Sequence, residues 1–197
     1  MLSSRRLLVI LILVAVSSGR PTAGVSASPT QDHCYRGTAG SSESFTVTGE
    51  AGWSARTVEA TLRPLGGPSG ALGLVLHHQD DSNLYLFLYG TGTTALRIYR
   101  KFEGSYTLLA STPDTIPPGE AHVMRAVDAG EGRLELHLDG VLRAETVDTT
   151  FDAGRVGLRV YDVSADFDDV LALDAAGDTL IADDFDDGDA AGWVAGP

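Results

Sequence analysis

The sequence predicts an all-β protein made of two packed antiparallel sheets. After residue 27, no segment repeats apolar side chains with the 3.6-residue period of a helix. Short runs that alternate between apolar and polar residues follow one another at a spacing of roughly ten residues, which is typical of β-sandwiches and barrels. Gly, Pro and Asp separate these runs, as expected for the turns between strands.

Twelve strands are expected, which fit two sheets of about five to seven strands each. The Asp139-Gly140 pair predicts a two-residue hairpin turn, because both residues tolerate the positive φ angles that such a turn needs. In order, the expected strands are Ser44–Val47, Ser54–Arg63, Ala71–His78, Asn83–Tyr89, Thr94–Lys101, Tyr106–Ser111, Ala121–Val127, Arg133–Asp139, Val141–Val147, Arg155–Tyr161, Ala165–Leu173 and Thr179–Ala182.

The strand at residues 83–89 is apolar on both faces, so we expect it in the centre of a sheet that is covered on both sides. Its three leucines share one face and its three aromatic residues share the other. We expect the leucines to fill the core and the aromatic residues to lie on the opposite face, with one or two of the rings buried as well. The two sets are Leu84, Leu86 and Leu88, and Tyr85, Phe87 and Tyr89.

The N-terminus has the pattern of a signal peptide. Arg5 and Arg6 precede the apolar run 7–16, and Val25-Ser26-Ala27 places small residues before the expected cleavage site. The apolar run is shorter than the roughly 20 residues that cross a bilayer, which favours a cleaved signal over a membrane anchor. We therefore expect residues 1–27 to be removed and the mature protein to be secreted or extracytoplasmic, with no membrane insertion.

About 170 residues remain after cleavage, a length that suits a single domain. Residues 28–43 are expected to form a flexible N-terminal arm, and residues 44–197 to form the sandwich. The arm contains Cys34, the only cysteine of the chain. We expect it to be a free thiol, and the alternative is a disulfide between two chains.

The chain is acidic, with a formal net charge of −13. Removal of the signal peptide takes away three arginines and no acidic residue, so the net charge of the mature chain is −16. Phosphate backbones and anionic lipid head groups repel a chain of this charge, so neither nucleic acid nor a membrane surface is expected as a partner. The acidity favours solubility, and we expect a monomer.

Six segments between residues 72 and 173 carry a resemblance to a known family. In order they are Gly73–Leu76, Asp81–Phe87, Leu96–Tyr99, Leu134–Gly140, Gly154–Arg159 and Phe167–Val170. They resemble a concanavalin A-like, laminin G-like domain of exported bacterial proteins, and this resemblance implies a two-sheet antiparallel jelly-roll sandwich. It leaves function open, because this fold hosts lectins, glycan hydrolases, non-catalytic modules and adhesion domains.

The order of two motifs departs from the family. There, an Asp-Asp-Phe-x-x-Gly…Trp segment opens the domain, and its strand pairs with the closing Phe-Asp-x-Val strand. Here the corresponding Asp183–Gly188 and Trp193 come last. We expect a circular permutation in which 170–173 pairs with 179–185, so that residues 183–197 close the sandwich. The alternative is that these residues begin a second domain.

The same two strands contain the residues expected to bind a metal ion. In relatives a structural calcium bridges the opening and closing strands, and the resemblance maps this role onto Asp168, Asp169, Asp183 and Asp184. Calcium takes about six to eight oxygen ligands, and a cation would relieve the repulsion between carboxylates that the strand pairing brings together. The alternative is a solvated acidic edge that deters aggregation of sheets.

Strand parity predicts a polar, aromatic surface. On several strands, arginines and tyrosines alternate with apolar residues and therefore share one face. Lectin-like jelly rolls place aromatic rings against sugar faces and bind hydroxyl groups with polar side chains. The alternative is a set of ordinary exposed residues paired across strands with acids. The candidate carbohydrate-binding residues are Tyr89, Arg97, Tyr99, Arg125, Arg159 and Tyr161.

No motif predicts catalysis, and no catalytic residue is expected. Glycan hydrolases of this fold carry a Glu-x-Asp-x-x-Glu strand motif that supplies two carboxylates. The nearest segment, 135–140, does not match, because its Asp139 belongs to the turn. We expect an exported, non-catalytic carbohydrate-binding module. The alternatives are a glycan hydrolase or lyase relative, and a structural or adhesion domain without a sugar site.

Overall fold

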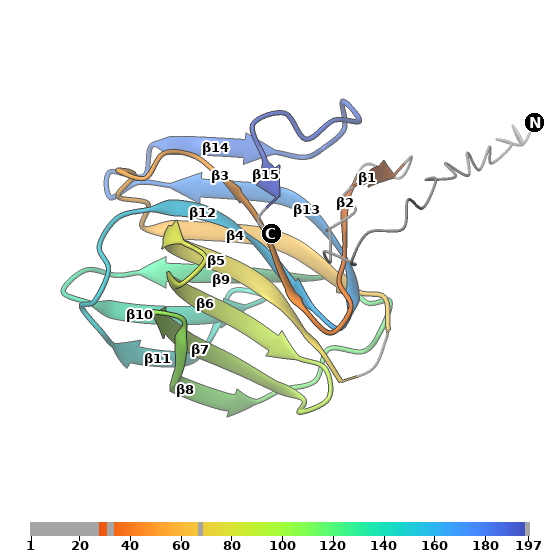
Figure 1. Cartoon of the computed structure of the whole chain (residues 1–197), viewed down its shortest axis with the longest axis horizontal. Coiled ribbons are helices and arrows are strands. Elements are labelled where there is room, and N and C mark those ends of the chain that lie inside the picture. The colour runs from red at the N-terminus through yellow and green to blue at the C-terminus, as the bar shows by residue number, and fades with distance from the viewer. Residues whose placement is uncertain (1–27, 31–33, 67–68, 196–197) are drawn as a thin grey trace, which may run out of the picture.

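The computed structural model describes residues 28–30, 34–66 and 69–195, which fold into two antiparallel sheets packed face to face. Figure 1 shows the two layers, with β5 to β8 in one and β9 to β11 in the other. The predicted signal peptide at residues 1–27 lies outside the described residues. Within the described ranges, no helix has the length and apolar content needed to cross a membrane.

Sheet A has eight strands. Seven follow the order β1-β2-β13-β4-β9-β10-β11, and β14 also pairs with β13. Their bounds are β1 (Ser28–Thr30), β2 (Cys34–Thr38), β4 (Thr57–Pro64), β9 (His122–Asp128), β10 (Arg133–Leu138), β11 (Val141–Val147), β13 (Ser164–Leu173) and β14 (Thr179–Asp183).

Sheet B has seven strands in the order β15-β3-β12-β5-β6-β7-β8. The twelve strands expected from the sequence correspond to β3 through β14, so the predicted all-β, two-sheet antiparallel sandwich is confirmed. The bounds in sheet B are β3 (Glu43–Thr48), β5 (Ala71–Asp80), β6 (Asn83–Gly90), β7 (Ala95–Phe102), β8 (Ser105–Pro113), β12 (Arg155–Tyr161) and β15 (Val194–Ala195).

The predicted hairpin turn between β10 and β11 is present. Leu138 pairs with Val141, which leaves two residues in the turn. Asp139 and Gly140 have φ angles of 51° and 75°. Both values lie in the left-handed region that a two-residue hairpin turn requires, and few residues other than Gly, Asn and Asp adopt it.

The core lies between the sheets and follows the period of two that the sequence shows. On β4, Val58, Ala60 and Leu62 are fully buried, whereas Glu59 and Thr61 between them are partly exposed. Alternate side chains of a strand point to opposite faces, so one face of β4 packs on the core and the other meets solvent.

The expected orientation of β6 is wrong. Its aromatic residues lie in the core between the sheets, and its leucines lie on the outer face of sheet B, where a second apolar cluster buries them. The tyrosine hydroxyls are satisfied in the core: Tyr85 donates to Oδ1 of Asp148 at 2.6 Å, and Tyr89 accepts the backbone N–H of Ile116 at 3.1 Å. Because loops supply these partners, the large rings can fill the core without leaving a polar group unpaired.

Part of the expected flexible N-terminal arm is a strand instead. β2 pairs with the first half of β13 in sheet A, and Cys34 and Tyr35 are buried. The hydroxyl of Tyr35 shares a 2.6 Å hydrogen bond with Oγ1 of Thr46 on β3. Cys34 is buried on β2, and its state as a free thiol stays a prediction. Apolar burial and a strand partner therefore make β2 part of the sandwich, in a region that the sequence predicted to be a flexible arm.

The expected pairing of the two C-terminal motifs is present. β14 pairs with the second half of β13, with Val170 opposite Asp183, and β2 occupies the first half of the same edge. Phe185 is fully buried, and its ring centroid lies 5.5 Å from that of Tyr35 and 5.8 Å from that of Trp193. The segment after β14 therefore packs on the sandwich and covers one end of its core.

Candidate functional site

A pocket of about 350 Å³ lies on the outer face of sheet B, away from the core between the sheets. This volume falls within the range of roughly 300–1,000 Å³ that is usual for small-ligand sites. Two arginines and three tyrosines are among the residues that line it. The full lining is Ser69, Gly70, Ala71, Leu88, Gly90, Gly92, Thr93, Arg97, Tyr99, Tyr106, Arg159 and Tyr161.

The register of sheet B produces the hollow shape. Arg159 on β12 stands opposite Gly73 on β5. Gly73 stands opposite Leu88 on β6, and Leu88 stands opposite Arg97 on β7. The two arginines thus stand at the two ends of one row of residues across four strands. At the usual strand spacing their Cα atoms are about 14 Å apart. Between them the row has one glycine and one leucine, so long side chains form walls around a low floor.

Small residues keep the floor low. In the adjacent row, Tyr161 stands opposite Ala71, and Ala71 stands opposite Gly90. At Gly73 an added Cβ would lie 2.0 Å from the backbone oxygen of Phe87, so any other residue would force the backbone of these two strands to shift. The close approach of the two strands therefore excludes any side chain from this part of the floor.

Arg159 and Tyr161 form one wall of the pocket. The guanidinium carbon of Arg159 lies 5.5 Å from the centroid of the Tyr161 ring, within the range of a cation–π contact. Arg159 is 7% exposed, and its Nη2 donates to Oε2 of Glu43 at 3.2 Å. These contacts hold the guanidinium against the floor.

Glu43, the first residue of β3, contacts residues of both walls and joins three side chains. It accepts hydrogen bonds from Lys101, from the hydroxyl of Tyr106 and from Arg159. Burial alone would raise the pKa of Glu43, but these hydrogen bonds and the charges of Arg159 and Lys101 outweigh it and hold the pKa below its ordinary value. The carboxylate is therefore ionised and organises the wall.

Arg97, Tyr99 and Tyr106 form the opposite wall. The rings of Tyr99 and Tyr106 meet edge to face, with centroids 6.1 Å apart and an interplanar angle of 88°. Nη1 of Arg97 donates to the hydroxyl of Tyr99 at 3.4 Å. Burial, together with the hydrogen bond to Glu43 and its charge, raises the pKa of Tyr106, so this hydroxyl stays protonated.

The two pocket arginines retain unused hydrogen-bond donors. Nε of Arg97 and both Nε and Nη1 of Arg159 are buried and have no acceptor among the described residues. Arginine can only donate hydrogen bonds and stays charged. Buried donors without a partner are uncommon, and a ligand with acceptor groups would satisfy those of the two pocket arginines.

The structure brings together four of the six candidate carbohydrate-binding residues. Arg97, Tyr99, Arg159 and Tyr161 all line the pocket. Tyr89 lies in the core between the sheets. Arg125 is on β9 in sheet A, where its Nε donates to Glu59 at 2.5 Å. That these residues bind a sugar stays a prediction.

Sequence reasoning missed Tyr106. Tyr106 stands opposite Lys101 in the β7–β8 hairpin, and Lys101 lies two residues after Tyr99 on β7. Lys101 and Tyr99 share a face by strand parity, so the hairpin register would have placed Tyr106 beside them. The polar residues Ser69 and Thr93 come from loops, and their position follows only from the folded structure.

The four candidate calcium ligands lie near the β13–β14 pair, but many of their oxygens already accept hydrogen bonds within the chain. Oδ2 of Asp169 accepts from Thr61, and Oδ2 of Asp183 accepts the indole N–H of Trp193. Asp168 and Asp184 each accept a backbone N–H one or two residues further on. Among the described residues, no group of three or more His, Cys, Asp or Glu is arranged to hold a metal ion. Calcium stays a prediction from sequence.

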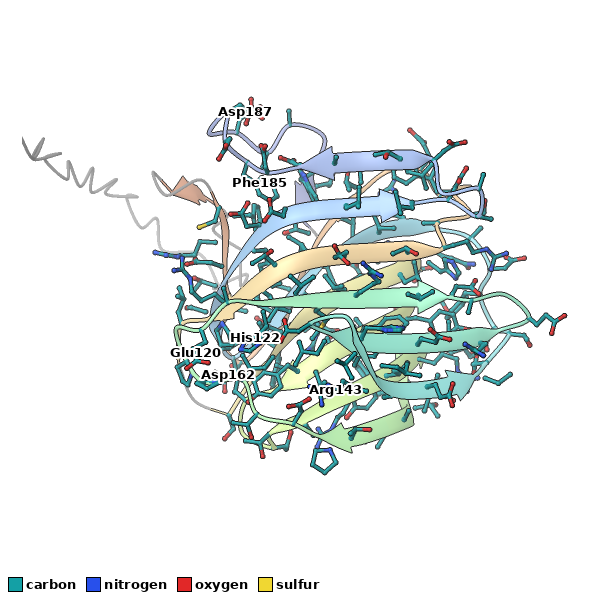
Figure 2. All side chains as sticks on the ribbon, turned by 180° about the vertical axis from the view of Figure 1, so that it is seen from behind. Glu120, His122, Arg143, Asp162, Phe185 and Asp187 are labelled. Atoms are coloured by element: carbon teal, nitrogen blue, oxygen red, sulfur yellow. The ribbon has the colours of Figure 1, made fainter. Side chains whose placement is uncertain are left out.

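Electrostatic repulsion at this end of sheet A is nevertheless present. Burial, followed by the negative charges of Asp169, Asp186 and Asp184, raises the pKa of Asp168. Figure 2 shows Asp187 on the outer loop after β14, away from the sheets, whereas Phe185 lies against the sandwich. The acidic residues of the loop are therefore largely solvated.

No protein-family model and no curated protein sequence matches the chain. Solved structures do match. The carbohydrate-binding module CBM66 from Bacillus subtilis is 22% identical, with a TM-score of 0.66 over 74% of this chain and 89% of that one. A Bacillus subtilis protein of unknown function with a galectin-like fold is 14% identical, with a TM-score of 0.57 over 76% and 86%. Sheep galectin-11 in complex with glycerol is 11% identical, with a TM-score of 0.50 over 66% and 96%.

These likenesses establish the class of fold. The chain has a concanavalin A-like jelly-roll sandwich fold, which confirms the fold that the sequence resemblance implies. That the domain is laminin G-like stays a prediction. At these levels of identity the comparison concerns the fold alone, and the ligand has to be argued from the pocket.

Proposed function

We propose that this protein is an exported, non-catalytic carbohydrate-binding module that takes its ligand in the pocket on sheet B. The observation that carries the proposal is the row in which Arg159 and Arg97 stand at the two ends, with one glycine and one leucine between them. Tyrosines line both sides of that row. The likeness to a carbohydrate-binding module supports the proposal at the level of fold.

The chemistry of the walls suits a sugar. Sugars have apolar C–H faces and a rim of hydroxyl groups, so they need flat apolar surfaces next to hydrogen-bonding groups. Tyr99, Tyr106 and Tyr161 supply rings with a polar end. Arg97 and Arg159 supply free donors, and an open, preformed pocket spares the ligand much of the cost of ordering the protein.

The lining argues against glycoside hydrolysis in this pocket. Most glycosidases use two carboxyl groups that flank the bond to be broken. None of the residues that line the pocket is acidic, and Glu43, which contacts Arg159 and Tyr106 of the lining, is held by three donors. Binding without turnover is the function that this set of side chains supports best.

Export rests on the N-terminal pattern of the sequence, with Arg5 and Arg6 before the apolar run. The function of the pocket is consistent with an extracytoplasmic site, where polysaccharides are found. A structural calcium near Asp168 and Asp183 would stabilise the domain and take no part in binding, because these residues lie in sheet A and the pocket lies on sheet B.

A glycan panel tests the proposal. Mature protein and the variant Tyr99→Ala are screened against immobilised glycans, and hits are measured by calorimetry in solution. We expect wild-type protein to bind and the Tyr99→Ala variant to lose at least tenfold in affinity, because the variant lacks the apolar contact area and the hydroxyl of one pocket ring. Arg125→Ala on sheet A is the matched control and should bind like wild type. Equal binding by all three proteins, or no binding at all, would contradict the proposed site.

A second assay tests the absence of turnover. Each polysaccharide that binds is incubated with the protein, and the release of reducing ends and of unsaturated products is followed. We expect neither. Product release that disappears when Glu43 is replaced by Gln would show an enzyme in place of a binding module.

A further inference from the structure

We propose that the pocket on sheet B selects an anionic sugar, one with a carboxylate or sulfate group, and that Arg97 is the residue that pairs with the anion. This inference rests on the proposed function and adds to it the class of ligand. It follows from the charges of the pocket and from the partners of its two arginines.

The charge of the lining is positive in a strongly acidic protein. Arg97 and Arg159 line the pocket, and no acidic residue does. The whole chain has a formal net charge of −13. General surface composition therefore does not account for two arginines beside one hollow with no carboxylate among them.

The two arginines differ in their partners. Arg159 pairs with Glu43 at 3.2 Å. Glu43 also pairs with Lys101 at 2.5 Å, so one carboxylate serves two cations. None of the ion pairs between described residues includes Arg97, whose polar contact is the hydroxyl of Tyr99. Arg97 is thus the pocket cation with no acidic partner in the described chain.

The free donors point to the same ligand. Nε of Arg97 is buried without an acceptor, and so are Nε and Nη1 of Arg159. Only 7% of Arg159 is exposed. The planar guanidinium matches carboxylate and sulfate-like groups with two parallel hydrogen bonds, and such charge-assisted bonds are about twice as strong as neutral ones. A neutral sugar would supply hydroxyl acceptors but would leave the charge of Arg97 uncompensated.

The test uses pairs of oligosaccharides that differ only in charge. One pair is an oligogalacturonide and its carboxyl-reduced form, and the other is a sulfated galactan oligosaccharide and its desulfated form. Calorimetry is done on the mature protein at 0.15 M salt, where charges beyond about 8 Å are largely screened. We expect a charged member to bind at least tenfold more tightly than its neutral partner, and the preferred pair distinguishes carboxylate from sulfate.

Two variants locate the effect. Arg97→Gln should reduce the preference for the charged sugar over its neutral partner at least tenfold, because glutamine keeps a hydrogen-bond donor but carries no charge. Arg125→Gln removes an arginine of the opposite sheet and should leave both affinities unchanged. Equal loss of both sugars in Arg97→Gln, or equal affinity of wild-type protein for both members of each pair, would overturn the anionic preference while leaving carbohydrate binding intact. Failure of all glycans to bind would overturn both proposals.

Discussion

The indole N–H of Trp193 donates a hydrogen bond to Oδ2 of Asp183 at 2.7 Å. Asp183 is the last residue of β14, and Trp193 immediately precedes β15 in the other sheet. The bond closes the acidic loop over Phe185, whose ring contacts both Trp193 and Tyr35. The C-terminal segment is therefore tied to sheet A by β14 and to sheet B by β15, and Phe185 fills the core between them.

Replacing Phe185 with alanine should destabilise the domain by about 3–5 kcal/mol, because a fully buried ring leaves a cavity. Denaturant unfolding followed by tryptophan fluorescence measures the change. Asp187→Ala in the same loop is the control and should stay within about 0.5 kcal/mol, since its side chain is exposed. A loss below about 1 kcal/mol for Phe185→Ala would mean that the segment does not belong to the cooperative core.

Glu43 should make stability depend on pH. Its folded pKa lies below the ordinary value of 4.5, so its contribution is present above that value and is lost as the pH falls through the lowered folded pKa. The comparison is the unfolding free energy of wild type and Glu43→Gln from about pH 7 to about pH 3. We expect the wild type to be the more stable at neutral pH and the difference to shrink in acid. A difference that grows in acid would contradict the assigned charge.

Gly73→Ala should destabilise the sandwich by about 1–3 kcal/mol, because the new Cβ would overlap the backbone oxygen of Phe87. Gly40→Ala is a matched control, since a Cβ at Gly40 meets no atom within 4 Å. Thermal unfolding of the two variants gives the comparison. Equal melting temperatures would show that the two strands separate easily at Gly73 and that the floor of the pocket is soft.

Calcium is tested by melting the protein with calcium and with chelator. A site that binds only the folded state and is saturated at 100 times its dissociation constant adds about 2.7 kcal/mol, which corresponds to several degrees for a domain of this size. We expect such a rise with calcium, and Asp168→Asn together with Asp183→Asn should abolish it. A difference in melting temperature below about 1 °C between calcium and chelator in the wild-type protein would contradict the predicted calcium site.

The strands could be predicted because alternation with a period of two is a local property. On β4 the buried and partly exposed residues alternate along the whole strand, and the sequence shows the same pattern. The Asp139-Gly140 turn was predictable for a similar reason, since its two φ angles depend on those residues alone. Both features require no knowledge of distant contacts.

The orientation of β6 could not be predicted in this way. Both faces of the strand are apolar, so its pattern does not say which face meets sheet A. The choice depends on Asp148 and Ile116, which lie far along the chain and satisfy the hydroxyls of Tyr85 and Tyr89. Only the folded chain brings these partners together.

Some of the residues that line the pocket could be predicted from the sequence, but the shape of its floor could not. Strand parity placed Arg97 with Tyr99 and Arg159 with Tyr161, and the structure unites the two pairs. Parity does not reveal which sheet a strand joins. The prediction therefore included Arg125, although this residue lies on β9 in sheet A. The low floor depends on register as well, because Gly73 matters only once it stands between the two arginines.

The central claim is that a sugar binds on the outer face of sheet B, and amide chemical shifts measured during a glycan titration test it most directly. The glycan is the tightest ligand from the panel, added to isotopically labelled mature protein. We expect the shifts to concentrate at residues of β5, β6, β7 and β12 around Arg97, Tyr99, Arg159 and Tyr161. Shifts that concentrate on sheet A around Arg125, or the absence of any shift with every glycan of the panel, would contradict the account.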